Sequence, residues 1–363
     1  NFIPPILNAA KLAEADVNEG GGILGGQDFT LVVVDGQAAP QPSVDAANKL
    51  VNVENVAAIM GALSSGATIA AANAVSIPNE VLQVSPTATS PAMTDLEDGD
   101  FAFRIVPSDN YQGEVLAKVV LDEGISSVAV TYVNNDYGVG IANTFKAAYE
   151  ALGGSVTGFE KHEDKKNSYR GELATLAGGD AEALVVIAYA AGSGAKIVKQ
   201  SLENGFFENF IGTDGLRDDI LIEQVGADAL ASTFFTSPTS PEDNPVRDSL
   251  HERFDATFGE GSDKPFVDQS YDATMLIALA IEKAGSTDRT AVRDALREVA
   301  NEPGEIVGPG DWAKAVQLLS EGKDINYEGA SGSHEFDENG DVSGYIGKFV
   351  VDGDSYKQIA VFQ

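Results

Sequence analysis

The sequence predicts an α/β fold with two lobes, each built on an open and largely parallel sheet. Helical and strand patterns alternate along most of the chain, as they do in βαβ units. Strand-like runs such as residues 29–35 (FTLVVVD) are continuously apolar, which is typical of parallel strands covered on both faces. The length of 363 residues exceeds the usual size of a single hydrophobic core, so we expect two lobes.

The first series of elements opens with a helix over residues 7–18. Its apolar residues lie near helical spacing, and a glycine cluster at residues 20–22 ends it. The elements expected next are the strand 29–35, the helix 43–50, the strand 56–60, the helix 65–76, the strand 80–84 and the extended run 101–106.

A second series with the same alternation follows. Its expected elements are the helix 111–123, the strand 127–132, the helix 140–152, the strand 155–160, the helix 168–176, the strand 183–189, the helix 193–204 and the strand 210–212. Two βα series joined by a loop indicate two similar open sheets.

The alternation of strands and helices ends at residues 231–241 (ASTFFTSPTSP), a linker rich in Ser, Thr and Pro. We expect three helices beyond it, over residues 245–258, 269–284 and 289–301, and then a meander of antiparallel strands over 333–362 with a turn at 337–341. The chain is therefore expected to cross between lobes three times, with residues 1–108 and 236–328 in one lobe and 109–235 and 329–363 in the other.

Composition excludes several classes of protein. An apolar fraction of 43% is ample for folded cores, and no run of about 18 apolar residues indicates a membrane span. The chain has no cysteine, which rules out disulfides, thiolate zinc sites and cysteine nucleophiles. No basic segment followed by an apolar one opens the chain, so we expect any secretion signal to be absent from it.

Acidic residues outnumber basic ones by 56 to 23, which gives a formal net charge of -33. This charge repels nucleic-acid phosphates and anionic lipid surfaces, so neither is an expected partner. Because the acidic residues are spread along the chain rather than gathered in a tail, we interpret them as a solvation surface suited to a saline environment.

Candidate ligand contacts follow the predicted strands, because open α/β sheets bind ligands beyond the carboxyl ends of their strands. In residues 61–68 (GALSSGAT), Ser64 and Ser65 open a helix and can accept an anionic carboxylate together with the helix N-H groups. A plain helix cap explains the same residues equally well. In residues 85–91 (SPTATSP), Thr87 and Thr89 can point the same way, although a simple Ser/Thr/Pro turn is as common.

Asp214 lies at a third strand exit, in residues 211–216 (IGTDGL). A carboxylate facing a cleft there can neutralise an α-ammonium group, although Asp before Gly is also a common turn. Tyr137, in residues 134–140 (NNDYGVG), and Tyr189, in residues 185–192 (VVIAYAAG), can supply aromatic walls for an apolar ligand body.

Catalytic and cofactor interpretations have less support. None of the three histidines lies in a strand-end loop beside a nucleophile. Residues 188–196 (AYAAGSGAK) lack the third glycine of a dinucleotide-binding loop, and residues 337–341 (DENGD) lack the glycine and the bidentate acid of a calcium loop. We therefore expect no catalytic residue, no metal and no cofactor.

The segments that carry a family likeness cover nearly the whole chain: PPILNAAKLAEADVNEGGGILG, GALSSGAT, QVSPTATSP, FRIVPSDNYQG, NNDYGVG, FIGTDG, QSYDATMLIALA and YEGASGSHEFDENGD. In this order and spacing, the sequence resembles the leucine/isoleucine/valine-binding proteins, the type I periplasmic solute-binding proteins of ABC importers. The resemblance implies two doubly wound parallel-sheet lobes joined by three hinge crossovers. It also implies a first β-strand ahead of Asn1.

The resemblance further implies a division of the site between the lobes. The first lobe would hold the carboxylate and ammonium of an amino acid through its serine-rich loop and its S-P-x-A-T loop, which here supply Ser64, Ser65, Ser85, Thr87, Ala88 and Thr89. The second lobe would close on the ligand with Tyr137, Tyr189 and Asp214, the last standing where relatives often have a glutamate.

The function implied is that of a periplasmic, monomeric binding subunit that catalyses nothing. Its ligand would be a branched-chain or related hydrophobic amino acid, and its partner a membrane permease. Three alternatives remain open from the sequence: a different small carboxylate or amide as ligand, a ligand-sensing ectodomain, and an NAD-dependent oxidoreductase.

Overall fold

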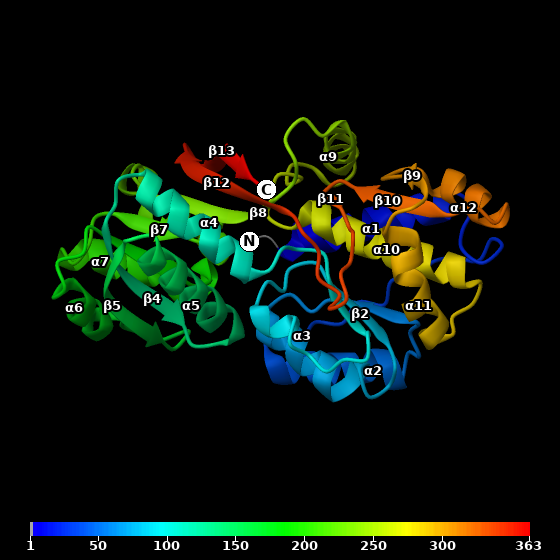
Figure 1. Cartoon of the computed structure of the whole chain (residues 1–363), viewed down its shortest axis with the longest axis horizontal. Helices are drawn as coiled ribbons and strands as arrows, with labels where there is room; N and C mark the ends of the chain where they lie inside the picture. The colour runs from blue at the N-terminus through cyan, green and yellow to red at the C-terminus, as the bar shows by residue number, and fades with distance from the viewer. Residues whose placement is uncertain (1–2) are drawn as a thin grey trace. The chain divides into compact units, whose positions relative to one another are not determined.

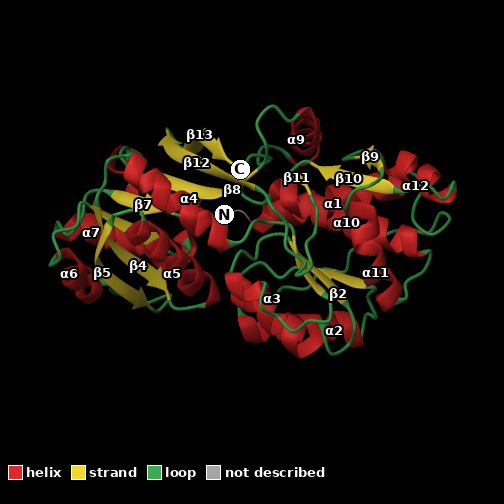
Figure 2. Ribbon diagram, viewed as in Figure 1, coloured by secondary structure: helices red, strands yellow, loops and turns green. Residues whose placement is uncertain are grey.

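A seven-stranded sheet forms the centre of one of two units in the computed structural model, which describes residues 3–363. We call this unit lobe C; it comprises Ser108–Thr239 and Tyr345–Gln363. The other unit, lobe N, comprises residues 3–107 and Ser240–Gly344. The α/β prediction with largely parallel sheets is confirmed (Figures 1 and 2).

In lobe C, the strand order is β13-β12-β8-β7-β6-β4-β5. The parallel strands are β4 (Ser127–Val133), β5 (Ser155–His162), β6 (Ala183–Ile187), β7 (Phe210–Gly212) and β8 (Phe234–Thr239). Two antiparallel strands, β12 (Tyr345–Asp352) and β13 (Ser355–Phe362), extend the sheet beyond β8. Only this pair matches the antiparallel meander that we predicted for the tail.

Helices cover both faces of this sheet, as a doubly wound fold requires. The core on one face contains α4 (Asp109–Asp122) and α5 (Asp136–Ala151). The core on the other face contains α6 (Arg170–Ala177), α7 (Ala195–Asn204) and α8 (Asp219–Val225). Strand β6 is buried at every residue, which explains its continuous apolar run.

Lobe N has a smaller parallel sheet, in the order β1 (Ala58–Met60), β2 (Leu82–Ser85) and β3 (Ala102–Arg104). A second small sheet has β10 (Ile325–Gly329) between β9 (Glu305–Val307) and β11 (Gly332–Ser333). The helices of this lobe are α1 (Ile3–Glu19), α2 (Pro40–Asn52), α3 (Ser65–Ala71), α9 (Pro245–Phe258), α10 (Val267–Ala284), α11 (Arg289–Ala300) and α12 (Trp312–Ser320). Helix α10 is buried along almost its whole length and forms the centre of the main core.

The strand predicted at residues 29–35 is wrong, because this segment has no sheet partner among the described residues. Side chains of α1, rather than the backbone of a neighbouring strand, satisfy the backbone groups of this segment. Asn18 pairs with both backbone groups of Phe29, and Glu14 accepts from the Leu31 N-H at 2.7 Å. Between this segment and β1 lies an apolar cavity of about 410 Å³.

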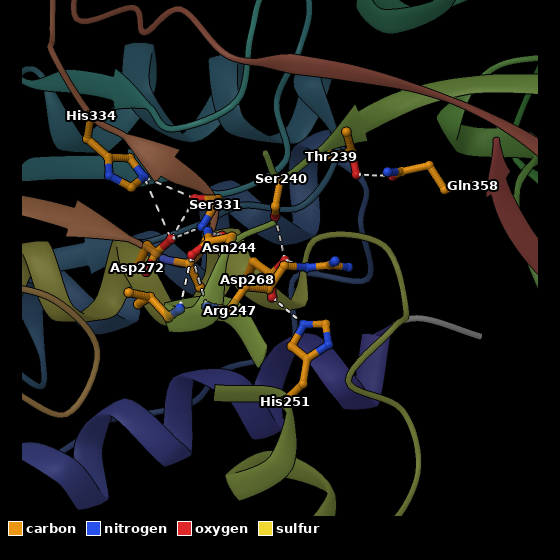
Figure 3. A network of polar contacts seen from close by, with 12 residues as sticks. Thr239, Ser240, Asn244, Arg247, His251, Asp268, Asp272, Ser331, His334 and Gln358 are labelled. Carbon is orange, nitrogen blue, oxygen red and sulfur yellow. Dashed lines mark hydrogen bonds and ion pairs between the residues drawn. The ribbon is translucent and has the colours of Figure 1, made fainter. Parts of the chain in front are cut away.

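The third crossover also lies later than we predicted. Residues 329–344 belong to lobe N rather than to lobe C. They are held there by the buried Asp272 on α10, which accepts hydrogen bonds from the N-H groups of Ala330 and Ser331 at 3.1 and 2.7 Å (Figure 3). The first strand of the meander predicted to begin at residue 333 is reduced to the end of β11, at Ser333.

At the second crossover, each lobe anchors its own side of the chain (Figure 3). In lobe C, the Thr239 hydroxyl donates to Gln358 Oε1 at 2.6 Å. In lobe N, the Ser240 hydroxyl donates to Asp268 Oδ2 at 2.6 Å, and the same carboxylate binds Arg247 and His251. These partners keep the pKa of Asp268 below its usual value although the group is buried. The crossover therefore lies between Thr239 and Ser240, whose side chains are hydrogen-bonded within different lobes.

The acidic surface predicts that salt stabilises the protein. With a net charge of -33, self-repulsion opposes the folded state, and raising NaCl from about 0.1 M to about 1 M shortens the screening length from about 10 Å to about 3 Å. We expect the melting temperature to rise through this range, with KCl acting equally. Sorbitol at matched osmolality controls for cosolute exclusion. A melting temperature that stays constant or falls in NaCl would contradict this interpretation.

Candidate ligand-binding site

Three of the residues singled out in the sequence lie together on lobe C. Tyr137, Tyr189 and Asp214 follow the carboxyl ends of β4, β6 and β7, which are neighbours in the sheet. The rings of Tyr137 and Tyr189 stack with centroids 5.3 Å apart. The Tyr137 hydroxyl donates to Asp214 Oδ1 at 3.0 Å. The sheet topology therefore brings two aromatic rings and one carboxylate to a single edge.

Asp214 is held by donors that come from different parts of the chain. Besides the Tyr137 hydroxyl, Gln112 Nε2 on α4 donates to Asp214 Oδ1 at 3.0 Å and to the Thr236 carbonyl at 3.1 Å. Thr213 shares a 2.7 Å hydrogen bond with the Tyr137 hydroxyl. The hydrogen bonds from Gln112 and Tyr137 both end on Oδ1, so they fix the orientation of the carboxylate from one side.

Burial raises the pKa of the Asp214 carboxyl to about 6. The hydrogen bonds from Gln112 and Tyr137 oppose this shift, as does the positive charge of Arg217. Burial also raises the pKa of Tyr137 and Tyr189 well above the usual value, and the nearby Asp214 adds to it, so both phenols stay neutral. The Asp214 carboxylate is therefore an anion at neutral pH whose charge is only partly compensated by its surroundings. Such a site is expected to attract a cationic group of a ligand.

In lobe N, the two predicted loops follow adjacent parallel strands, β1 and β2, and are joined by their own hydroxyl groups. The Ser85 hydroxyl donates to the Ala62 carbonyl at 3.1 Å, and the Thr87 hydroxyl donates to the Leu63 carbonyl. Ser65 Oγ accepts from the Ser90 N-H at 3.2 Å. The loops thus form one unit at the edge of the small sheet.

These contacts determine which side-chain groups remain available. Ser64 is the cap residue of α3, and its hydroxyl donates to the Ala38 carbonyl at 2.9 Å, so the capping role considered from the sequence is present. Ala88 is fully buried. The Thr89 hydroxyl is also buried and has no hydrogen-bond partner among the described residues. Of the predicted lobe N side chains, Thr89 is therefore the one whose polar atom most needs a ligand.

Two residues that support the site were missed from the sequence. Gln112 lies on the buried face of α4 with Val115 and Leu116, so a polar residue at a core position was the signal. Gln83 on β2 donates to the carbonyls of Gly61 and Thr68 at 3.0 and 3.2 Å and thereby supports the first loop. Their partners are distant in sequence, so spacing alone could not reveal the contacts.

Within residues 3–363, no group of His, Asp and Glu side chains is arranged to hold a metal ion. None of the helices in the same range is both long and apolar enough to cross a membrane.

Comparison with known proteins places this geometry in a family. A family model described as periplasmic binding protein matches residues 1–318. The chain belongs to this family. The periplasmic binding proteins are substrate-binding proteins rather than enzymes, and they work outside the cytoplasm. The fold is that of the type I members, as the sequence predicted.

Two relatives differ in their stated functions. The leucine-, isoleucine-, valine-, threonine-, and alanine-binding protein of Pseudomonas aeruginosa is 29% identical over 289 residues, which cover 79% of this chain and 76% of the relative. The substrate-binding protein BasB of a chemotactic signal transduction system in Halobacterium salinarum is 25% identical over 347 residues, which cover 90% and 76%.

Solved structures agree on the fold. A leucine-binding protein from Thermotoga maritima superposes with a TM-score of 0.83 at 26% identity, covering 99% of this chain and 94% of that one. A solute-binding protein from Rhodopseudomonas palustris in complex with benzoate reaches 0.78 at 16% identity, covering 99% and 93%, and shows the fold alone.

Proposed function

We propose that this chain is the extracytoplasmic solute-binding subunit of an ABC importer and that it binds a branched-chain or related hydrophobic amino acid in the cleft between its lobes. The observation that carries the proposal is the buried carboxylate of Asp214 beside the stacked rings of Tyr137 and Tyr189. This arrangement offers a counter-charge for an α-ammonium group and aromatic surface for an apolar side chain.

The carboxylate of the ligand would be held by lobe N. Ser65 and Thr89 have hydroxyl groups, and the N-terminus of α3 has N-H groups, that can donate where an anion is favoured. Ser85 and Thr87 hold the two loops together, because their hydroxyl groups already donate to backbone carbonyls. A ligand that touches both lobes stabilises the closed form over the open one, because only the closed form lets it use both sets of contacts. A membrane permease would recognise and bind the closed form. The subunit would act as a monomer.

A thermal-shift screen tests this proposal. The ligand-free protein is scanned against amino acids, small amides, benzoate and its hydroxylated derivatives, and NAD. A ligand at a thousandfold excess over its dissociation constant stabilises the folded state by about 4 kcal/mol. We expect the largest shift with leucine, isoleucine or valine. A response confined to benzoates or to NAD would refute the amino-acid proposal.

Sensing is the second candidate, and the relationship to BasB favours it. An importer subunit and a sensor can bind the same ligand and differ in the membrane protein that reads the closed form. Ligand-dependent crosslinking in membranes distinguishes them: capture of a permease supports import, whereas capture of a chemotaxis transducer supports sensing.

Binding is expected to depend on pH through Asp214. Burial raises the pKa of Asp214 to about 6. The side chain that would pair with the ligand ammonium is therefore almost fully ionised above pH 7, and it loses its charge as the pH falls through 6. We expect the dissociation constant for leucine to be flat from pH 7 to 8.5 and to rise toward tenfold per pH unit below about 6. Calorimetric titration across this range measures it. A flat profile down to pH 5 would contradict the role of this carboxylate.

A further inference from the structure

The guanidinium group of Arg104 lies beneath the loop formed by residues 85–90. Arg104 is the last residue of β3 and is fully buried. Its Nη1 donates to two consecutive carbonyl oxygens of that loop, those of Thr89 at 2.9 Å and of Ser90 at 2.7 Å. One nitrogen therefore fixes the peptide groups on both sides of Ser90, directly after the unpartnered hydroxyl of Thr89.

The other nitrogen of the same group connects the loop to a distant turn. Arg104 Nη2 donates to Asp341 Oδ2 and to Thr94 Oγ1, at 2.6 and 2.7 Å, and Thr94 also donates to Asp341 Oδ2 at 2.6 Å. Asp341 lies in the turn 337–341, whose Gly340 carbonyl accepts from the Arg104 N-H at 3.1 Å. The acidic turn that resembled part of a calcium loop thus serves as the counter-charge for a buried arginine.

We propose that Arg104 and Asp341 form a positioning pair that sets the orientation of Thr89 for ligand binding. This inference rests on the proposed function, because it concerns the same loop. A guanidinium has donors in a fixed fork, so it can hold two carbonyls and a carboxylate at once, whereas a lysine ammonium cannot reproduce that geometry. Loss of the fork removes one hydrogen bond from each of the two carbonyls, of which that of Ser90 still accepts from the Met93 N-H at 3.1 Å, and frees the loop to shift at Thr89.

The test compares Arg104→Lys with a control ion pair in the same lobe. Arg253 binds both oxygens of Asp16 at 2.6 and 2.7 Å, joining α9 to α1 away from the two ligand loops, so Arg253→Lys perturbs a structural pair of the same chemistry. For each variant, leucine affinity is measured by calorimetry, and the stability of the ligand-free protein is measured by urea unfolding.

We expect Arg104→Lys to weaken leucine binding at least tenfold, whereas Arg253→Lys changes the affinity less than about twofold even where it lowers stability. Asp341→Asn keeps the shape and one acceptor oxygen, so it should fold and weaken binding by an intermediate factor. An Arg104→Lys or Asp341→Asn protein that is destabilised but binds leucine as tightly as the unmodified protein would overturn the proposal.

A second readout does not depend on a ligand. Amide hydrogen exchange in peptides that cover residues 85–91 should accelerate in ligand-free Arg104→Lys and remain unchanged in Arg253→Lys. Equal protection of this loop in both variants refutes the positioning role. Failure of the proposed function is seen separately, as an unmodified protein that binds no amino acid.

Discussion

Replacing Asp214 with asparagine is expected to weaken amino-acid binding by about 30-fold or more. Removing one partner of a buried, hydrogen-bonded charge pair typically costs about 2–5 kcal/mol, because the other charge is left buried without compensation. Asparagine has the same shape and can still accept from Gln112 and Tyr137, so the surroundings should be preserved. Calorimetric titration with leucine at pH 7.5 measures the effect.

The same variant should not destabilise the ligand-free protein. The pKa of Asp214 is raised to about 6 in the fold, above the usual carboxyl value, so the ionised group costs stability at neutral pH. We therefore expect Asp214→Asn to melt at the same temperature as the unmodified protein or higher, and its weak binding to be independent of pH between 5 and 8.

Asp218→Asn provides the control. Asp218 is buried in the same lobe, and its side chain accepts from the Ile220 N-H at the start of α8, a role that asparagine can fill. This variant should bind leucine normally. Unchanged affinity in Asp214→Asn, or an equal loss in both variants, would remove Asp214 from the site.

Replacing Asp272 with alanine is expected to lower the free energy of unfolding by about 3 kcal/mol or more, which is a larger loss than we expect for any other substitution proposed for this protein. Its carboxylate accepts from the Tyr327 hydroxyl at 2.8 Å, from the Ala330 N-H and from both the N-H and the hydroxyl of Ser331. All of these donors are buried, and each one left unsatisfied costs about 1–3 kcal/mol. Urea unfolding measures the change.

Asp272→Asn separates the loss of hydrogen bonds from the effect of the empty space that alanine would leave at this position. It fills the same volume and retains one acceptor oxygen, so we expect a smaller loss than for alanine. Because Asp272 ties residues 330–331 to α10, hydrogen exchange in the alanine variant should accelerate first in the segment that follows β10. A loss below about 1 kcal/mol for alanine would show that the structure closes around the missing carboxylate.

The sequence allowed most of lobe C to be predicted, because its strands are continuous apolar runs separated by helices of regular period. Strand β6 and the helix that follows it are where the pattern placed them. Residues 29–35 have the same apolar composition, yet they form no strand. A strand requires a neighbouring backbone, and composition says nothing about whether one is present.

The candidate site could be predicted only in part. Asp214 and Tyr137 occur at strand ends, a position that alternating patterns reveal. Gln112 and Arg104 act through partners 102 and 237 positions away in the sequence, Asp214 and Asp341. Local spacing does not contain such contacts. The third crossover was misplaced for the same reason, since the tie between Asp272 and Ser331 spans 59 positions.

The most direct test of the central claim is a calorimetric titration of the ligand-free protein with leucine and with two analogues, one lacking the ammonium group and one with its carboxylate converted to an amide. We expect leucine to bind and both analogues to bind at least about tenfold more weakly, because each analogue loses the contacts of one lobe. If the analogue without an ammonium group binds as tightly as leucine, the proposed pairing of Asp214 with an amino acid is wrong.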